Sequence, residues 1–541
     1  MRGLARQTIP VPSPFGLAVV AFLYFGVCSF LSAQSDTATL SGRITDPSGS
    51  VISGVEVVAA NNNTGIKVTA QSNDSGIYVV QDLRPGDYRV TVEKPGFRKV
   101  VLTGLILSVQ DALSRNFIMQ IGPVNESVVV QSTAEETSVS PAVSTVVDQE
   151  FVQNIPLNGR TFQSLLALTP GYAVTVPAYV QSGVAFGQLN FNGQRANANY
   201  FTVDGMSWNF GIYGFGQSAG GTIPAFTIEG TTNGLVPVDA MQEFRVLTSS
   251  FAPEYGRTPG GQVSVITRSG TNQPHGTLFD YLRNDAFDAR NYFDAPPLPK
   301  PPLRQNDFGG TLGAAIRKDR AFFFFSYEGL RLLLPETSTG NFYTAAARAN
   351  VAQVYRPLLA ALPIPTGPVN SDGITAPLTV AYSDPTSFDS YSLRIDYNVN
   401  SRMTLFGRYS HAPSTESTHY FSELDNANSK VDSLTVGTTI TLGPEQVNDF
   451  RANWSRAQSR QWAAMVRFYG AVPPPESLLY PPGYNIDVHV SFTPRWAGWG
   501  DPQWRWHGEP TATGICGHFL QVCRNPSTQA GCRSSSANTG D

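Results

Sequence analysis

The sequence predicts a mostly β protein with an N-terminal β-sandwich, a central α+β domain and a partial transmembrane antiparallel β-barrel. Three observations carry this prediction. The 541 residues include 49 Gly and 39 Pro, with 14% charged and 11% aromatic side chains, a composition that suits many turns and strands. Short alternating strands recur about every ten residues over 37–120, and longer alternating segments follow from residue 276. After the N-terminal run, no stretch approaches the length of an apolar membrane helix, so any later membrane insertion must use strands.

The composition and the motifs argue against several function classes. The aromatic content excludes a disordered chain, and a net charge of −4 without a basic patch argues against nucleic acid as a partner. No zincin, phosphate-loop or dinucleotide motif occurs. One G-x-S-x-G match, Gly216–Gly220, has glycine-rich, loop-like flanks instead of the strand and helix of a nucleophile elbow. We therefore expect no enzyme and assign no catalytic, cofactor or metal site.

Residues 1–33 are predicted to be a secretory signal. Arg2 and Arg6 precede an apolar run over 15–31, and Ser32-Ala33-Gln34 places a small residue before the expected cleavage point. The alternative is a transmembrane anchor, because this run is near the lower length limit for spanning a bilayer.

Residues 37–120 predict a β-sandwich, because turn clusters separate its short strands at sandwich spacing. The pattern resembles the carboxypeptidase regulatory-like domain, which shares the fold of some carbohydrate-binding modules. The matching positions are Gly42, Asp46, Gly54-Val55, Gly76-x-Tyr78, Pro85-Gly86-x-Tyr88 and Gly96-Phe97. No His precedes His275, so the zinc ligands of the peptidase that gives the family its name are absent. A structural or docking role is the expectation.

Residues 140–272 predict an α+β domain. A helix ending near Ile155 and a second helical segment stopped by Pro170-Gly171 come first. An apolar strand then runs into the Asp204-Gly205 turn. The stretch 239–272 closes the domain with an amphipathic segment, a Tyr-Gly-Arg turn, a double glycine and an alternating strand.

These elements and their order resemble the plug domain of TonB-dependent outer-membrane receptors of the Oar-like group. The closing turn matches the group's Glu-Tyr-Gly-x-x-x-Gly-Gly pattern at Glu254, Tyr255, Gly256, Gly260 and Gly261. The resemblance implies a barrel around the plug. We expect several of the plug's charged groups to pair within the plug or with the barrel wall. The candidates are Arg195, Asp204, Glu243, Arg245, Glu254 and Arg257.

Residues 125–135 form an apolar patch between polar flanks. In receptors of this kind such a segment follows the accessory domain and serves as the TonB box, so the resemblance implies a TonB-type energy-transducing protein as partner. An exposed β-prone run can add a strand to a partner's sheet edge. The residues expected to do so are Glu126, Ser127, Val128, Val129 and Val130. The alternative is an interdomain linker with one β-prone patch.

Residues 276–493 predict the N-terminal part of an outer-membrane β-barrel. Seven alternating segments are joined by tight turns at Lys318-Asp319 and Asn400-Ser401 and by longer Pro-rich or polar spans. The aromatic residues at 322–325 and 327 are expected to belong to a membrane-interface girdle. A soluble β-core is the alternative.

The last part of the chain departs from the receptor pattern. Plugged transporters have about 22 strands, more than the segments found after residue 276. Residues 494–541 concentrate Trp and Cys and carry no strand periodicity, so we expect an incomplete receptor with an aberrant, frameshifted tail. The alternative is a Cys/His site, although the spacing fits no usual zinc pattern. Its candidate ligands are His507, Cys516, His518 and Cys523.

The functional hypothesis is an exported TonB-dependent receptor or transporter of the Gram-negative outer membrane. Its external substrate is unidentified; carbohydrate, peptide and metal-chelate cargo all remain open. Two other hypotheses are a periplasmic carbohydrate- or protein-binding module and a nonfunctional gene fragment.

Overall fold

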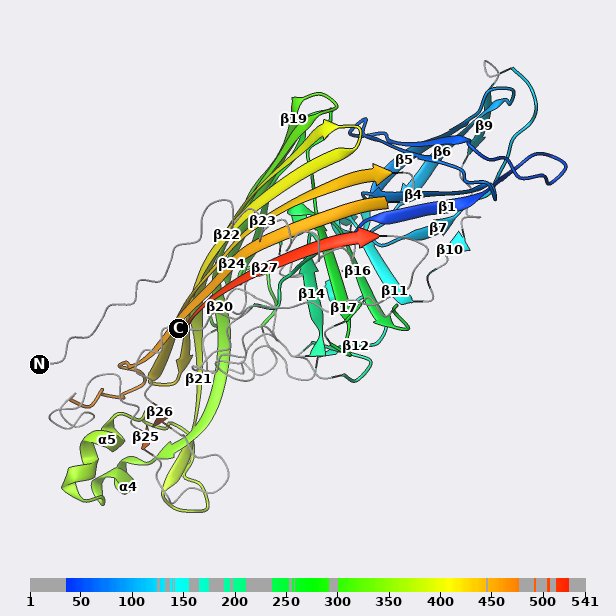
Figure 1. Ribbon diagram of the computed structural model, residues 1–541. Coiled ribbons are helices and arrows are strands. Elements are labelled where there is room, and N and C mark those ends of the chain that lie inside the picture. Colours follow the sequence, from blue (N-terminus) through cyan, green and yellow to red (C-terminus); the bar gives the residue numbers. More distant parts are fainter. Residues whose placement is uncertain are drawn as a thin grey trace, which may run out of the picture.

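A computed structural model shows three β-rich parts (Figure 1). The described residues are 36–123, 127–131, 137–138, 140, 142–154, 165–174, 189–194, 198–210, 236–252, 255–256, 258–290, 300–443, 446–475, 491–492, 504–505 and 512–524. The expected signal segment and the G-x-S-x-G match lie outside them. Among the described residues, no helix combines the length and apolarity needed to cross a membrane.

The N-terminal part, called here the sandwich domain, consists of two sheets around one apolar core. One sheet has the order β3-β2-β5-β6-β9, and the other has the order β10-β7-β1-β4 with β8 on β1. The strands are β1 (Ala38–Thr45), β2 (Glu56–Asn61), β3 (Lys67–Gln71), β4 (Ile77–Leu83), β5 (Gly86–Glu93), β6 (Lys99–Leu107), β7 (Ala112–Ser114), β8 (Phe117–Ile118), β9 (Ser127–Gln131) and β10 (Thr137–Ser138). Leu40, Val57, Val90 and Leu102 are fully buried between the sheets. The predicted N-terminal sandwich is confirmed.

The central part, called here the plug-like domain, is built on a sheet of order β11-β16-β17-β14-β15. Its elements are β11 (Val143–Asp148), α2 (Gln149–Asn154), β12 (Tyr172–Val174), β13 (Leu189–Phe191), β14 (Tyr200–Val203), β15 (Met206–Ser207), η3 (Val238–Ala240), β16 (Met241–Ser249) and β17 (Gln262–Thr267). Every residue of β14 and β17 is buried, because the sheet is covered on both faces. Phe191, Phe201, Trp208 and Phe244 fill its core.

The double glycine before β17 is explained by close packing. A Cβ on Gly260 would lie 2.4 Å from the carbonyl oxygen of Ala198, and one on Gly261 would lie 2.3 Å from the ring of Phe191. Neither glycine has a positive φ. The chain therefore uses glycine here for the close approach of neighbouring atoms.

Replacing Gly261 by Ala is expected to destabilise the plug-like domain by about 1–3 kcal/mol, the usual cost of overpacking a core. The matched control is Gly256→Ala in the same turn, because a Cβ there meets no atom within 4 Å. Protease cleavage of the plug-like domain as a function of urea measures both variants. Equal midpoints for the two variants would show that the close approach at Gly261 has no effect on stability.

The third part, called here the wall sheet, is antiparallel throughout and has the order β18-β19-β20-β21-β22-β23-β24-β27. The strands are β18 (His275–Asn284), β19 (Arg304–Arg317), β20 (Ala321–Tyr343), β21 (Thr375–Asn400), β22 (Met403–Tyr420), β23 (Glu423–Gly443), β24 (Gln446–Met465) and β27 (Ala512–Arg524). Short turns join β19 to β20, β21 to β22 and β23 to β24 at one end of the sheet. At the other end, α4 (Ala345–Ala349), η4 (Gln353–Tyr355) and α5 (Arg356–Ala360) interrupt the long β20–β21 connection (Figure 1). The predicted antiparallel barrel sheet is confirmed.

Along much of β21 and β23, the wall sheet has polar side chains on its inner face and apolar side chains on its outer face. On β21, Arg394 and Asp396 are 6% and 3% exposed, whereas Leu393 and Ile395, which alternate with them, are 43% and 45% exposed. The same alternation on β23 buries Thr435 and exposes Leu434 and Val436. A soluble sheet would bury its apolar face, so this reversal indicates a sheet whose outer face contacts lipid.

The aromatic run at the start of β20 divides between the two faces. Phe322 and Phe324 are 1% and 2% exposed and point toward the inner face, whereas Phe325 is 41% exposed. The expectation that all of 322–325 belong to a girdle is therefore wrong, because successive strand residues point to opposite faces.

The tail also differs from expectation, because strands form after residue 494. β27 pairs with the free edge of β24, and a short β26 (Trp504–Arg505) pairs with β25 (Ser491–Phe492). Pairing along a sheet edge uses backbone groups, so it does not require alternating side chains. His507 of the alternative Cys/His site lies outside the described residues.

Candidate functional site

The plug-like domain contacts the wall sheet through Asp204, in the turn between β14 and β15. Its side chain is 2% exposed and its φ is +49°, in the left-handed region that Asp tolerates in turns. Within the plug-like domain, Asp204 accepts hydrogen bonds from the backbone N–H and the hydroxyl of Thr267, each at 3.0 Å. The ends of β14 and β17 thus hold this carboxylate against the wall sheet.

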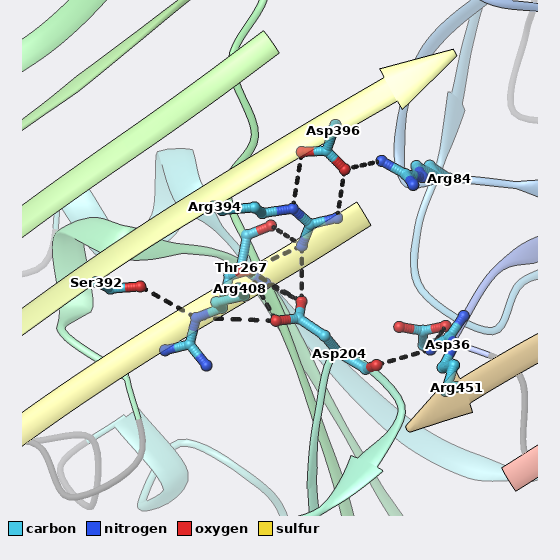
Figure 2. A network of polar contacts seen from close by, with 9 residues as sticks. All are labelled: Asp36, Arg84, Asp204, Thr267, Ser392, Arg394, Asp396, Arg408 and Arg451. Carbon is cyan, nitrogen blue, oxygen red and sulfur yellow. Dashed lines mark hydrogen bonds and ion pairs between the residues drawn. The ribbon is translucent and has the colours of Figure 1, made fainter. Parts of the chain in front are cut away.

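Two arginines of the wall sheet face Asp204 (Figure 2). Arg394 Nη1 on β21 donates to Asp204 Oδ1 at 2.9 Å, and Arg408 Nε on β22 lies 3.9 Å from Oδ2. Arg408 Nε also donates to the hydroxyl of Ser392 at 3.1 Å. The two strands bring these arginines together because Arg394 and Arg408 are register partners.

A third arginine, Arg451 on β24, contacts the backbone of the same turn. Its Nη1 donates to the carbonyl oxygen of Asp204 at 2.8 Å, and its Nη2 pairs with Asp449 at 2.8 Å. The wall sheet therefore contacts both the side chain and the backbone of the Asp204 turn.

The sandwich domain adds two charged side chains to this network. Arg84, at the turn between β4 and β5, pairs with Asp396 at 2.5 Å, and Asp396 in turn accepts from Arg394 at 2.9 Å. Asp36 pairs with Arg451. The sandwich domain thus lies at the short-turn end of the wall sheet (Figure 1), where Asn272 also bonds Asp319 of the β19–β20 turn at 2.8 Å.

The network, called here the three-domain joint, contains as many carboxylates as guanidinium groups. Its carboxylates are Asp36, Asp204, Asp396 and Asp449, and its guanidinium groups are Arg84, Arg394, Arg408 and Arg451. Buried charges persist only when they are paired and hydrogen-bonded, and here the formal charges cancel. A cavity of about 420 Å³, lined by residues of all three domains, lies beside the joint.

A second contact joins the plug-like domain directly to the sandwich domain. On β16, Glu243 accepts from the backbone N–H of Val109, and Arg245 pairs with Asp111. Arg245 also donates to the carbonyl oxygen of Gln110 at 3.2 Å. Glu243 and Arg245 therefore contact the sandwich domain, a partner outside the plug and the wall that the sequence suggested for this group of residues. They meet the loop between β6 and β7, which packs against this strand.

Burial raises the pKa of Glu243 to about 7, from an ordinary 4.5. The folded protein therefore binds more protons than the unfolded chain between these pH values. We expect the stability that protonated Glu243 contributes to be fully present below pH 4.5 and to be lost as the pH rises to about 7.

The difference in urea midpoint between the wild-type chain and Glu243→Gln isolates this effect from other titrating groups. The wild type should lose stability relative to the variant as the pH rises to 7, and the difference should be constant above that. A difference that does not change with pH would contradict the assignment.

The structure describes only some of the predicted site residues. Asp204, Glu243 and Arg245 all lie at contacts between domains, as given above. Ser127 to Val130 form most of β9, at the edge of the sandwich domain. Glu126, Arg195, Glu254 and Arg257 lie outside the described residues.

The sequence interpretation missed the wall and sandwich partners of Asp204. A usable signal existed in the wall strands: Arg394-Ile-Asp396 and Asp449-Phe-Arg451 place opposite charges two residues apart, on one face of a strand whose other face is apolar. Arg84 and Asp36 carried no such signal, because their partners lie more than 300 residues away in sequence.

Comparison with known proteins agrees with this arrangement. Residues 39–120 match the family described as carboxypeptidase regulatory-like domain, and residues 266–357 and 348–486 match the outer membrane beta barrel domain. The TonB-dependent transporter Oar of Myxococcus xanthus is 28% identical over 334 residues, which cover 58% of this chain and 28% of that protein. The chain is thus similar to this Oar transporter and carries the outer membrane beta barrel domain.

The barrel-domain match agrees with a wall sheet that lies in an outer membrane. Among solved structures, the outer membrane transporter YddB of Escherichia coli aligns with a TM-score of 0.45 and 11% identity, covering 72% of this chain and 46% of that one. The siderophore receptor PirA of Acinetobacter baumannii aligns with a TM-score of 0.39 and 14% identity, covering 62% of this chain and 42% of that one. The chain covers less than a third of the length of the Myxococcus xanthus transporter Oar.

Proposed function

We propose that this Oar-like chain provides the plug-bearing part of a TonB-dependent transporter that moves an external solute across the outer membrane. The observation that supports this most strongly is the reversed alternation of the wall sheet, with a packed domain held against its polar face by Asp204. A domain on the polar face of a membrane sheet occupies the path that a solute would take. Movement of that domain is then the event that opens the path.

The proposal assigns a role to each part of the chain. The wall sheet faces lipid, the plug-like domain blocks the lumen, and the three-domain joint keeps the plug-like domain in place until the partner acts. The segment 126–130 binds a TonB-type energy-transducing protein in the periplasm by strand addition. The solute is unidentified, and carbohydrate, peptide and metal-chelate classes all remain open.

Membrane fractionation of the expressed full chain tests the outer-membrane assignment. We expect the chain in the outer-membrane fraction, with an electrophoretic mobility that changes on heating, because a folded membrane sheet resists detergent until it is heated. Recovery as a soluble periplasmic protein would contradict the proposal and would favour a periplasmic binding module.

Capture of the full chain by the purified periplasmic domain of a TonB-type protein tests the partner assignment. Val129→Pro removes a backbone N–H and should lose binding, because strand addition depends on backbone hydrogen bonds. Val129→Thr keeps that N–H and the β-branched shape, so it should bind like the wild type. Equal binding by both variants would place the partner contact elsewhere.

A further inference from the structure

The TonB-box-like segment is itself a strand of the sandwich domain. Ser127–Gln131 forms β9 at the edge of its sheet and pairs in parallel with β6, from Lys99↔Ser127 to Thr103↔Gln131. Val130 packs against the sandwich core, whereas Val129 is 66% exposed. The segment therefore occupies an edge that a partner's strand would otherwise meet.

The chain that follows is held by the other sheet of the same domain. Thr137–Ser138 forms β10, which pairs antiparallel with β7 through Thr137↔Ser114 and Ser138↔Leu113. Only after this second attachment does the chain enter the plug-like domain as β11, the edge strand beside β16. The link between the expected partner site and the plug-like domain is thus attached to both sheets of the sandwich domain.

This path determines where a pulling force acts. While β9 and β10 stay paired, a force on residues 127–131 is borne by the sandwich domain. It reaches β11 and the plug-like domain only after both short strands have separated. Their pairing is short and the side chain of Val129 is largely exposed, so the strands can leave while the buried sandwich core stays folded.

We propose that the sandwich domain is a latch. It holds residues 127–131 as a fifth strand on β6, and the TonB-type partner must displace this strand from β6 before it can bind the segment and pull on the plug-like domain. The latch rests on the proposed function, because it regulates access to the same partner site.

A disulfide that fixes β9 on β6 tests the latch in the full chain, with the four native cysteines replaced by serine. Val101 and Val129 are register partners, and paired strands are about 4.8 Å apart, within the range that a disulfide spans. We expect oxidised V101C/V129C to lose binding of the purified periplasmic domain of a TonB-type protein, and reduction to restore it.

The matched control is T91C/V101C, which uses the same position on β6 but fixes β6 to β5. It should bind the partner equally when oxidised and when reduced. The latch would be overturned if the oxidised and reduced forms of V101C/V129C bound the partner equally. The partner would then bind the segment while β9 stays on β6.

Amide hydrogen exchange gives a readout that does not involve the partner. The latch predicts that the alternate amides of 127–131 that face β6 are protected in the unbound full chain. It also predicts that the amides of Lys99–Thr103 that face β9 exchange faster when the partner is bound, because β9 has then left β6. Exchange at the rate of a free peptide in the unbound chain would overturn the latch. Protected amides together with no binding by the wild-type or reduced forms would refute the proposed partner, and the latch with it.

Discussion

Replacing Arg394 by Met is expected to destabilise the contact between the plug-like domain and the wall sheet by about 3–5 kcal/mol. The substitution keeps an unbranched side chain but leaves Asp204 and Asp396 without their closest cation in the wall, and both carboxylates are at most 5% exposed. Leaving a buried carboxylate without its partner costs more free energy than the ion pair itself contributes to stability, so the expected loss of stability is large. Urea-dependent cleavage of the plug-like domain by protease in the purified full chain measures it.

Arg283→Met is the control for removing an arginine from an ion pair. Arg283 pairs with Asp288 at 2.8 Å, but its side chain is 45% exposed, and such surface pairs contribute about 0–1 kcal/mol. If the two variants lose the same stability, the three-domain joint does not hold the plug-like domain. Asp204→Asn in the Arg394→Met background should recover part of the lost stability, because it removes one of the two carboxylate charges that have lost their arginine.

Replacing Leu434 by Arg is expected to destabilise the wall sheet in a bilayer by about 2–4 kcal/mol. Leu434 is 43% exposed on the apolar face of β23, opposite the face that carries Thr435. A cation placed in the hydrocarbon region loses its hydration without gaining a partner. Denaturant titration of the chain refolded into lipid vesicles measures the change.

Asn428→Arg is the matched control, on the same strand and the same face. It lies six residues away, which is about 20 Å along an extended strand and outside the apolar band. We expect a change near zero there. Similar losses at both positions would mean that the apolar face of the wall sheet does not contact lipid.

The sequence contained enough information for the architecture of the three parts. Periodicity and turn residues identified the sandwich strands, since each strand is short and is bounded by turn clusters. In the wall sheet, register follows from tight turns such as Lys318-Asp319. These are local signals, so a single sequence can carry them.

The candidate site could be predicted only in part. Asp204 was found because it lies in a recognisable Asp-Gly turn, but its partners Arg394, Arg408 and Arg451 come from strands whose distance to that turn depends on how the plug-like domain sits in the sheet. The contacts of Glu243 and Arg245 with the sandwich domain were missed for the same reason: domain docking has no local sequence pattern. The sequence also did not indicate that Val128–Val130 pairs with β6. An unpaired exposed segment and a strand at the edge of a sheet can have the same residue composition.

The wall sheet separates a lipid-facing apolar side from a polar side that holds the plug-like domain. The most direct test is the accessibility of nitroxide labels on Ile395→Cys and Ser390→Cys of β21, with the full chain reconstituted in vesicles. Ile395 is 45% exposed on the outer face and Ser390 is 4% exposed on the inner face. We expect oxygen dissolved in the bilayer to relax the label at 395 strongly, whereas the label at 390 should be shielded. A label at 395 that responds instead to a water-soluble nickel chelate would contradict this expectation.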